Sequence, residues 1–186
     1  PLQAPHPPIV VTAVAPFSKG VTEAAARGWD PISANFLLPK WVATHWGSYK
    51  EGCARAGRPA DAANWRVAKS VFVADDLDVA REYALGPQSP YRFYYRQLVT
   101  KLVKGGRSNL FLDAPAGSNA AVDLERVLDD LVIWGTPDKV ADDLGRFREQ
   151  VGDFGTLLYA GKDWTDPALA KRSMTLLAEK VAPRLA

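Results

Sequence analysis

The strongest constraint on the fold is an alternation of short apolar runs with segments of helical periodicity. The first apolar run, residues 9–14, is rich in β-branched side chains, which is typical of a strand buried on both faces. Ser18 follows as the expected N-cap of a helix that stops near Gly28. Alternation of this kind predicts an α/β protein whose parallel strands are joined by right-handed helical crossovers.

The same patterns predict the other regular elements. Four strong strands are predicted, over residues 9–14, 31–36, 67–74 and 156–160. Helices are predicted after Ser18, from Pro39 to near Gly57, after Asp75-Asp76, over residues 91–103 and 123–131, after Thr136-Pro137 and after Asp166-Pro167.

Residues 86–134 interrupt this order. Gly86-Pro87 ends a helix, an aromatic-rich helix follows, and residues 105–119 are rich in Gly, Ser, Asn, Asp and Pro. Long excursions in compact folds often form lids or binding loops. We therefore expect a single unit over residues 1–186 that carries a helical and loop insertion over residues 86–134.

Composition excludes several classes of protein. A net charge of +2 and the lack of a long basic run argue against nucleic-acid binding. The single cysteine, Cys53, suits a reducing, cytoplasmic compartment and is expected to be a small core residue. Two histidines are too few for a zinc site, and no apolar run approaches the ~20 residues of a membrane span.

His45 is the only histidine within a predicted element. It lies on the apolar stripe of the helix that begins at Pro39, so a satisfied core histidine is favoured over a catalytic one. The sequence shows no Ser/His/Asp set and no carboxylates paired at a useful spacing.

The turn after the first strand is a candidate anion site. The N–H groups of Ser18, Lys19 and Gly20 lie at a helix start, where backbone donors are unpaired and the helix dipole is positive. Ser18 has two compatible interpretations, a phosphate contact and a plain N-cap. Lys19 either adds a compensating charge or is a solvated residue of the first turn.

Four stretches of this sequence resemble the bacterial luciferase-like flavin-dependent monooxygenases. The first is Pro-Pro-Ile-Val-Val-Thr-Ala-Val-Ala-Pro-Phe-Ser at residues 7–18, followed by residues 24–33. Residues 66–74 resemble a later barrel strand, residues 135–141 the start of the penultimate helix, and residues 154–161 the last strand. The similarity is greatest to the limonene-monooxygenase-like branch.

The resemblance implies a fold. The family forms an eight-stranded β/α barrel, which needs about 250 residues. This chain of 186 residues supplies about four β/α units. The resemblance therefore implies the C-terminal half of a TIM-type (β/α)8 barrel, with a helical insertion between the last two strands. We expect a fragment of a longer chain in preference to a natural half-barrel, and alone it should dimerise or aggregate through its exposed strand edges.

The resemblance also implies a cofactor. In this family reduced FMN, delivered by a separate flavin reductase, activates O₂ to oxygenate a small hydrophobic substrate. The cofactor-binding residues that it implies here are Ala13, Val14, Ala15, Ser18 and Lys19. The catalytic residues are expected in the missing N-terminal half, which would be a partner of this chain, so the fragment alone should be inactive.

Other polar and aromatic residues are candidates for the substrate pocket. Ser33 and Asn35 lie at the end of the second predicted strand, where lining the pocket and satisfying the barrel rim are equally supported. Tyr94 belongs to a tyrosine cluster that either walls the pocket or simply packs. A deazaflavin-dependent oxidoreductase of the same superfamily and a non-catalytic flavin-binding or scaffold protein remain the alternatives. A homodimer is the expected assembly.

Overall fold

The chain divides into two compact units in the computed structural model, which describes residues 2–112 and 121–185. The first unit comprises residues 1–68 and 148–158, and the second comprises residues 69–147 and 159–186. The polypeptide passes from one unit to the other within β3, α6 and β5. The expectation of a single unit over residues 1–186 stays a prediction.

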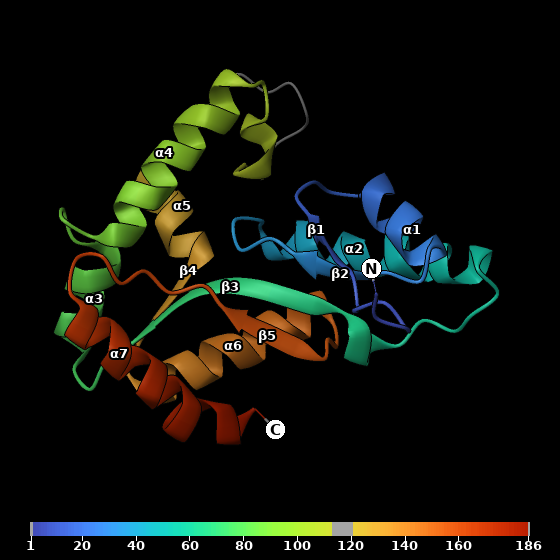
Figure 1. Cartoon of the computed structure of the whole chain (residues 1–186). Helices are drawn as coiled ribbons and strands as arrows, with labels where there is room; N and C mark the ends of the chain where they lie inside the picture. The colour runs from blue at the N-terminus through green and yellow to red at the C-terminus, as the bar shows by residue number, and fades with distance from the viewer. Residues whose placement is uncertain (1, 113–120, 186) are drawn as a thin grey trace. The chain divides into compact units, whose positions relative to one another are not determined.

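The first unit alternates parallel strands with helices (Figure 1). Its elements are β1 (Val10–Ala13), α1 (Lys19–Ala26), β2 (Asp30–Ser33), α2 (Pro39–Arg55), the 3₁₀ turn η1 (Ala62–Asn64) and the start of β3 (Arg66–Val73). β1 pairs with β2 in parallel from Val10 opposite Asp30 to Ala13 opposite Ser33. β2 in turn pairs in parallel with β3, where Ile32 lies opposite Arg66. The predicted parallel α/β pairing is confirmed.

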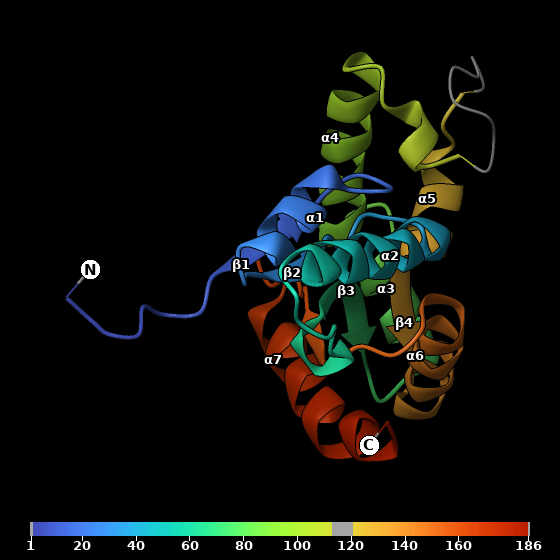
Figure 2. The ribbon, with the colours of Figure 1, turned by 90° about the vertical axis from the view of Figure 1, so that its right-hand side faces the viewer.

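Local chemistry sets the ends of α1 and α2, and a glycine brings them together. Ser18 caps α1, Gly28 follows it with a φ of 79°, and Pro39 is the first residue of α2, all as the sequence predicts. On α2, a Cβ added to Gly52 would lie only 2.2 Å from the carbonyl oxygen of Thr22. The two helices therefore pack backbone against backbone (Figure 2).

The core of the first unit lies between these helices and β1. Five buried residues form it: Ala13, Val21, Ala25, Tyr49 and Cys53. Cys53 is fully buried, so its prediction as a small core residue is confirmed.

The rest of β3 and the elements after it belong to the second unit, except residues 148–158, which hold the end of α6 and most of β5 and belong to the first. The elements after β3 are α3 (Leu77–Leu85), α4 (Pro90–Lys104), the 3₁₀ turn η2 (Ser108–Leu110), α5 (Leu124–Leu131), β4 (Val132–Gly135), α6 (Pro137–Val151), β5 (Thr156–Tyr159), α7 (Pro167–Leu176), the π-helical turn η3 (Leu177–Val181) and η4 (Ala182–Arg184). β3 pairs in parallel with β4, from Ser70 opposite Val132 to Val73 opposite Gly135. β5 also pairs with β3.

The predicted count of four strong strands is one short, because the described residues contain five. The additional strand is β4, whose residues 132–134 the sequence interpretation assigned to the end of the insertion. These residues directly follow α5 with no turn residue between them, and so short an apolar run shows no periodicity of its own. Within the predicted insertion, residues 113–120 lie outside the described residues.

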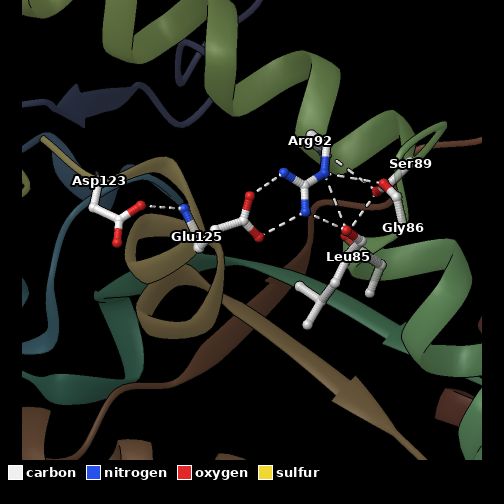
Figure 3. Close-up of polar contacts among 7 residues, drawn as sticks. Leu85, Gly86, Ser89, Arg92, Asp123 and Glu125 are labelled. Carbon is white, nitrogen blue, oxygen red and sulfur yellow. Dashed lines mark hydrogen bonds and ion pairs between the residues drawn. The ribbon is translucent and has the colours of Figure 1, made fainter.

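Arg92 joins three helices of the second unit (Figure 3). Its Nε donates to the carbonyl oxygens of Leu85 and Gly86, both at 3.0 Å, at the C-terminus of α3. Its two terminal nitrogens form a two-point ion pair with Glu125 on α5. Because these carbonyls have no partner within their own helix, the guanidinium of α4 caps α3 and holds α5 beside it.

Candidate functional site

The β1–α1 turn carries the five residues predicted to bind a cofactor. Ser18 is the N-cap of α1, and its Oγ accepts the N–H of Val21 at 3.3 Å. Lys19 and Gly20 are the first two residues of the helix, where N–H groups have no intrahelical partner. The positive end of the helix dipole therefore lies beside a hydroxyl group and an exposed lysine.

Backbone strain marks the same turn. Phe17 has a φ of 48°, which bulky residues rarely adopt, and its side chain is 71% exposed. Its N–H donates to Oγ1 of Thr44 on α2 at 2.9 Å. The hydroxyl of Thr44 donates in turn to the carbonyl oxygen of Trp41 at 2.6 Å. A strained conformation persists only where its surroundings hold it, and here α2 supplies a contact that does so.

A buried histidine lies beneath the turn. His45 on α2 is fully buried, and its Nε2 lies 2.8 Å from the carbonyl oxygen of Ala15. Its Nδ1 lies 2.8 Å from Oγ of Ser33, which also accepts the indole N–H of Trp65 at 3.0 Å. Burial lowers the pKa of His45. The prediction of a satisfied core histidine is confirmed, and its partners Ala15 and Ser33 link the β1–α1 turn and the end of β2 to α2.

The structure places the predicted cofactor residues on one short stretch of the first unit. Ala13 is buried at the end of β1, Val14 is 40% exposed, and Ala15 presents its carbonyl oxygen to His45. Ser18 and Lys19 begin the helix. Their contact with a cofactor stays a prediction.

The predicted pocket residues do not all fall in one unit. Ser33 lies at the end of β2, where it is fully buried among hydrogen-bond partners, and Asn35 follows it partly buried. Tyr94 belongs to the second unit, where Nζ of Lys162 lies 4.5 Å from the centre of its ring. A substrate role for these three residues stays a prediction.

Two lysines of the second unit were missed by sequence reasoning. Lys69 lies inside the apolar run of β3, and its side chain is buried against Phe147, with Nζ 5.1 Å from the ring centre. Lys162 follows β5 and lies over Tyr91 and Tyr94. A lysine inside a continuous apolar run is the one signal that could have identified the first of them.

An open depression of about 570 Å³ lies between α1 and α2. Phe17, Lys19 and Thr44 line one part of it, and the Glu23–Arg55 ion pair, at 2.7 Å, lines another. Lys19 is the predicted cofactor residue that contributes to its wall. The depression therefore adjoins the candidate turn.

Within residues 2–112 and 121–185, no three His, Cys, Asp or Glu side chains group as metal ligands would. None of the helices in these ranges combines the length and the apolar character needed to cross a membrane.

Comparison with known proteins supports the resemblance seen in the sequence. The family model described as luciferase-like monooxygenase matches residues 1–153. A 3,6-diketocamphane 1,6-monooxygenase of Pseudomonas putida is 28% identical over 180 residues, covering 96% of this chain and 47% of the relative. Limonene 1,2-monooxygenase of Rhodococcus erythropolis is 28% identical over 172 residues, covering 90% of this chain and 38% of the relative. The chain spans about half the length of the first of these curated relatives.

A solved structure gives the corresponding match in three dimensions. It is the oxygenating constituent of 3,6-diketocamphane monooxygenase from Pseudomonas putida, a type II Baeyer-Villiger monooxygenase in complex with FMN. The TM-score is 0.80 at 27% identity, over 96% of this chain and 49% of that chain. The predicted α/β fold, matching half the length of a luciferase-like barrel, is confirmed. That this is the C-terminal half stays a prediction.

Proposed function

The chain belongs to the luciferase-like monooxygenase family, and we propose that it is part of an FMN-dependent monooxygenase that oxygenates a small hydrophobic organic molecule. The observation that carries the proposal is the β1–α1 turn, where Ser18, Lys19 and the start of α1 form an anion-binding arrangement. Support also comes from the similar solved structure, which is an FMN complex.

The residues of the turn fit the phosphate of FMN. Oγ of Ser18 uses a lone pair to accept the N–H of Val21, so its own proton remains available to a phosphate oxygen. The ammonium group of Lys19 adds positive charge in the first turn. Capping and phosphate binding are thus two uses of the same hydroxyl group.

The reaction would be divided between the cofactor and the protein. Reduced FMN, when bound, supplies the chemistry that activates O₂. In this proposal Ser18, Lys19 and the N–H groups of the turn hold the phosphate. Buried side chains next to the turn, such as His45, exclude water from the protein side of the phosphate site.

The proposal also names partners. An eight-stranded barrel needs three more strands than the five of the described residues, so the N-terminal part of the barrel would complete the site. A separate flavin reductase would deliver reduced FMN, and a homodimer would be the working assembly.

Substitution of Ser18 tests the phosphate site and separates it from the cap. Ser18→Asp and Ser18→Asn both keep an N-cap acceptor, so both should preserve α1. The carboxylate of Ser18→Asp would repel the phosphate, and FMN binding should weaken about a hundredfold. Ser18→Asn should change it far less, whereas Ser18→Ala should weaken it several-fold.

The measurement is quenching of flavin fluorescence by the protein in its complete native form. Equal FMN affinity in the wild type and in Ser18→Asp would refute the phosphate site. The absorbance spectrum of the copurified cofactor distinguishes a flavin from a deazaflavin.

A further inference from the structure

Two neighbouring side chains of α2 contact the backbone of the β1–α1 turn. Nε2 of His45 lies 2.8 Å from the carbonyl oxygen of Ala15. Oγ1 of Thr44 accepts the N–H of Phe17 at 2.9 Å. Together they hold the turn on both sides of Pro16.

The partners of His45 determine where its proton lies. A carbonyl oxygen only accepts, so Nε2 must carry a proton to bond to Ala15. The indole N–H of Trp65 only donates, so Ser33 accepts from Trp65 and can give its own proton to Nδ1 of His45. Burial favours the uncharged ring. The ring is therefore the neutral Nε2–H tautomer, with both nitrogens engaged.

We propose that His45 is a positioning residue that holds the β1–α1 turn in the conformation required for Ser18 to contact the flavin phosphate. The inference rests on the proposed function, since it assigns His45 a task at that same site. Because its two nitrogens bond to Ala15 and Ser33, His45 acts through the backbone of the turn and does not itself touch the cofactor.

The strain at Phe17 explains why the turn needs such a support. A φ of 48° at a bulky residue is unfavourable and persists only while neighbouring contacts fix it. Loss of the bond to Ala15 would remove the support on one side, and Ser18 lies only three residues further along the chain. The turn would then relax, and the hydroxyl of Ser18 would move with it.

A pair of amide substitutions separates the two bonds of His45. The amide nitrogen of His45→Gln reaches the position of Nε2 and keeps a donor for Ala15. The amide of His45→Asn reaches only the position of Nδ1, so it keeps a partner for Ser33 and leaves Ala15 without a donor. Thr44→Val is a matched variant that removes the acceptor for Phe17 at similar volume.

Three measurements complete the test. Long-range ¹H–¹⁵N correlation spectra of the protein in its complete native form report the tautomer of His45, and hydrogen exchange reports the amide of Phe17 without cofactor. Flavin fluorescence quenching of the protein in its complete native form reports FMN affinity. We expect an unprotonated Nδ1, faster exchange at Phe17 in His45→Asn and Thr44→Val, and about tenfold weaker FMN binding in these two variants. In His45→Gln, both the exchange rate at Phe17 and the FMN affinity should stay within about threefold of the wild type.

Different outcomes identify different errors. Equal losses in His45→Asn and His45→Gln would mean that the histidine only stabilises the core, which overturns the proposal, as would a protonated Nδ1. If His45→Asn and Thr44→Val both bound FMN as tightly as the wild type, this proposal would be overturned while the proposed function stayed intact. If the wild type bound no FMN at all, the proposed function would fail, and the exchange data alone would still decide whether His45 holds the turn.

Discussion

Replacement of Lys69 by methionine should stabilise the protein at neutral pH. Lys69 is buried in β3, and desolvation lowers its pKa from 10.5 to about 8, against a smaller opposing effect of Asp130. At ~1.36 kcal/mol per pH unit, this corresponds to about 3 kcal/mol of unfavourable free energy at neutral pH. Methionine has a similar volume and can pack on the ring of Phe147.

The hydrogen bond that methionine removes reduces this gain. Nζ of Lys69 donates to the carbonyl oxygen of Asp130 at 3.4 Å, which is long for such a bond. Its loss should cost about 1 kcal/mol. The net expectation at pH 7 is therefore an increase of about 2 kcal/mol in the free energy of unfolding.

The stabilisation produced by Lys69→Met should decrease as the pH rises. The folded pKa of Lys69 lies below its unfolded value, so the cost is fully present below about pH 8 and is relieved as the pH rises towards 10.5. The advantage of Lys69→Met should shrink over this range and vanish near pH ~10. Burial also raises the pKa of Tyr83 to about 12, which lowers stability above pH 10 in both proteins alike.

Urea denaturation followed by circular dichroism at pH 7, 8, 9 and 9.5 provides the measurement. Lys171→Met is the control, because Lys171 is exposed on α7 and its replacement should change the free energy of unfolding by less than about 0.5 kcal/mol at each pH. The reasoning is refuted if Lys69→Met is less stable than the wild type at pH 7, or if the difference between them does not change with pH.

Two more predictions concern packing and a buried hydrogen bond. Gly52→Ala should destabilise the first unit by about 1–3 kcal/mol because its Cβ would collide with the carbonyl oxygen of Thr22. In contrast, Gly47→Ala on the same helix should stabilise the protein by up to about 1 kcal/mol, because an added Cβ there meets open space. Thermal denaturation that finds Gly52→Ala more stable than Gly47→Ala would contradict the backbone contact. Tyr91→Phe should cost about 1–3 kcal/mol in urea denaturation, because the Tyr91 hydroxyl donates to the buried carbonyl oxygen of Val71 at 2.6 Å; an unchanged midpoint would show that this bond contributes nothing.

Helix boundaries could be predicted because their determinants lie within a few residues. Ser18, Asp76, Asp123 and Asp166 each cap the helix that the sequence indicates. The parallel pairing of the strands follows from the helices between them. β4 was missed because three apolar residues directly after a helix carry no periodic signal.

The surroundings of the candidate site could not be predicted in the same way. That His45 is a satisfied core residue follows from its position on an apolar stripe. That its partners are Ser33 and Ala15 depends on contacts 12 and 30 residues away along the chain, which no local pattern encodes. Lys69 illustrates the same limit, because burial of a lysine in an apolar run depends on which helices cover the strand.

The clamp at Arg92 has a consequence for how this part of the protein can change over evolution. The segment that follows Arg92 returns to the same guanidinium group at Glu125, 33 residues later. Its two ends are therefore fastened at one point, and the entropy of closing such a loop changes by only ~0.6 kcal/mol when its length doubles. Tyr95, Leu110 and Phe111 within this segment are buried and belong to the core, but its exposed residues can be exchanged while α3 and α5 keep their places. The clamp therefore confines the effect of a change in the exposed part of this segment, because α3 and α5 stay fastened to each other through Arg92.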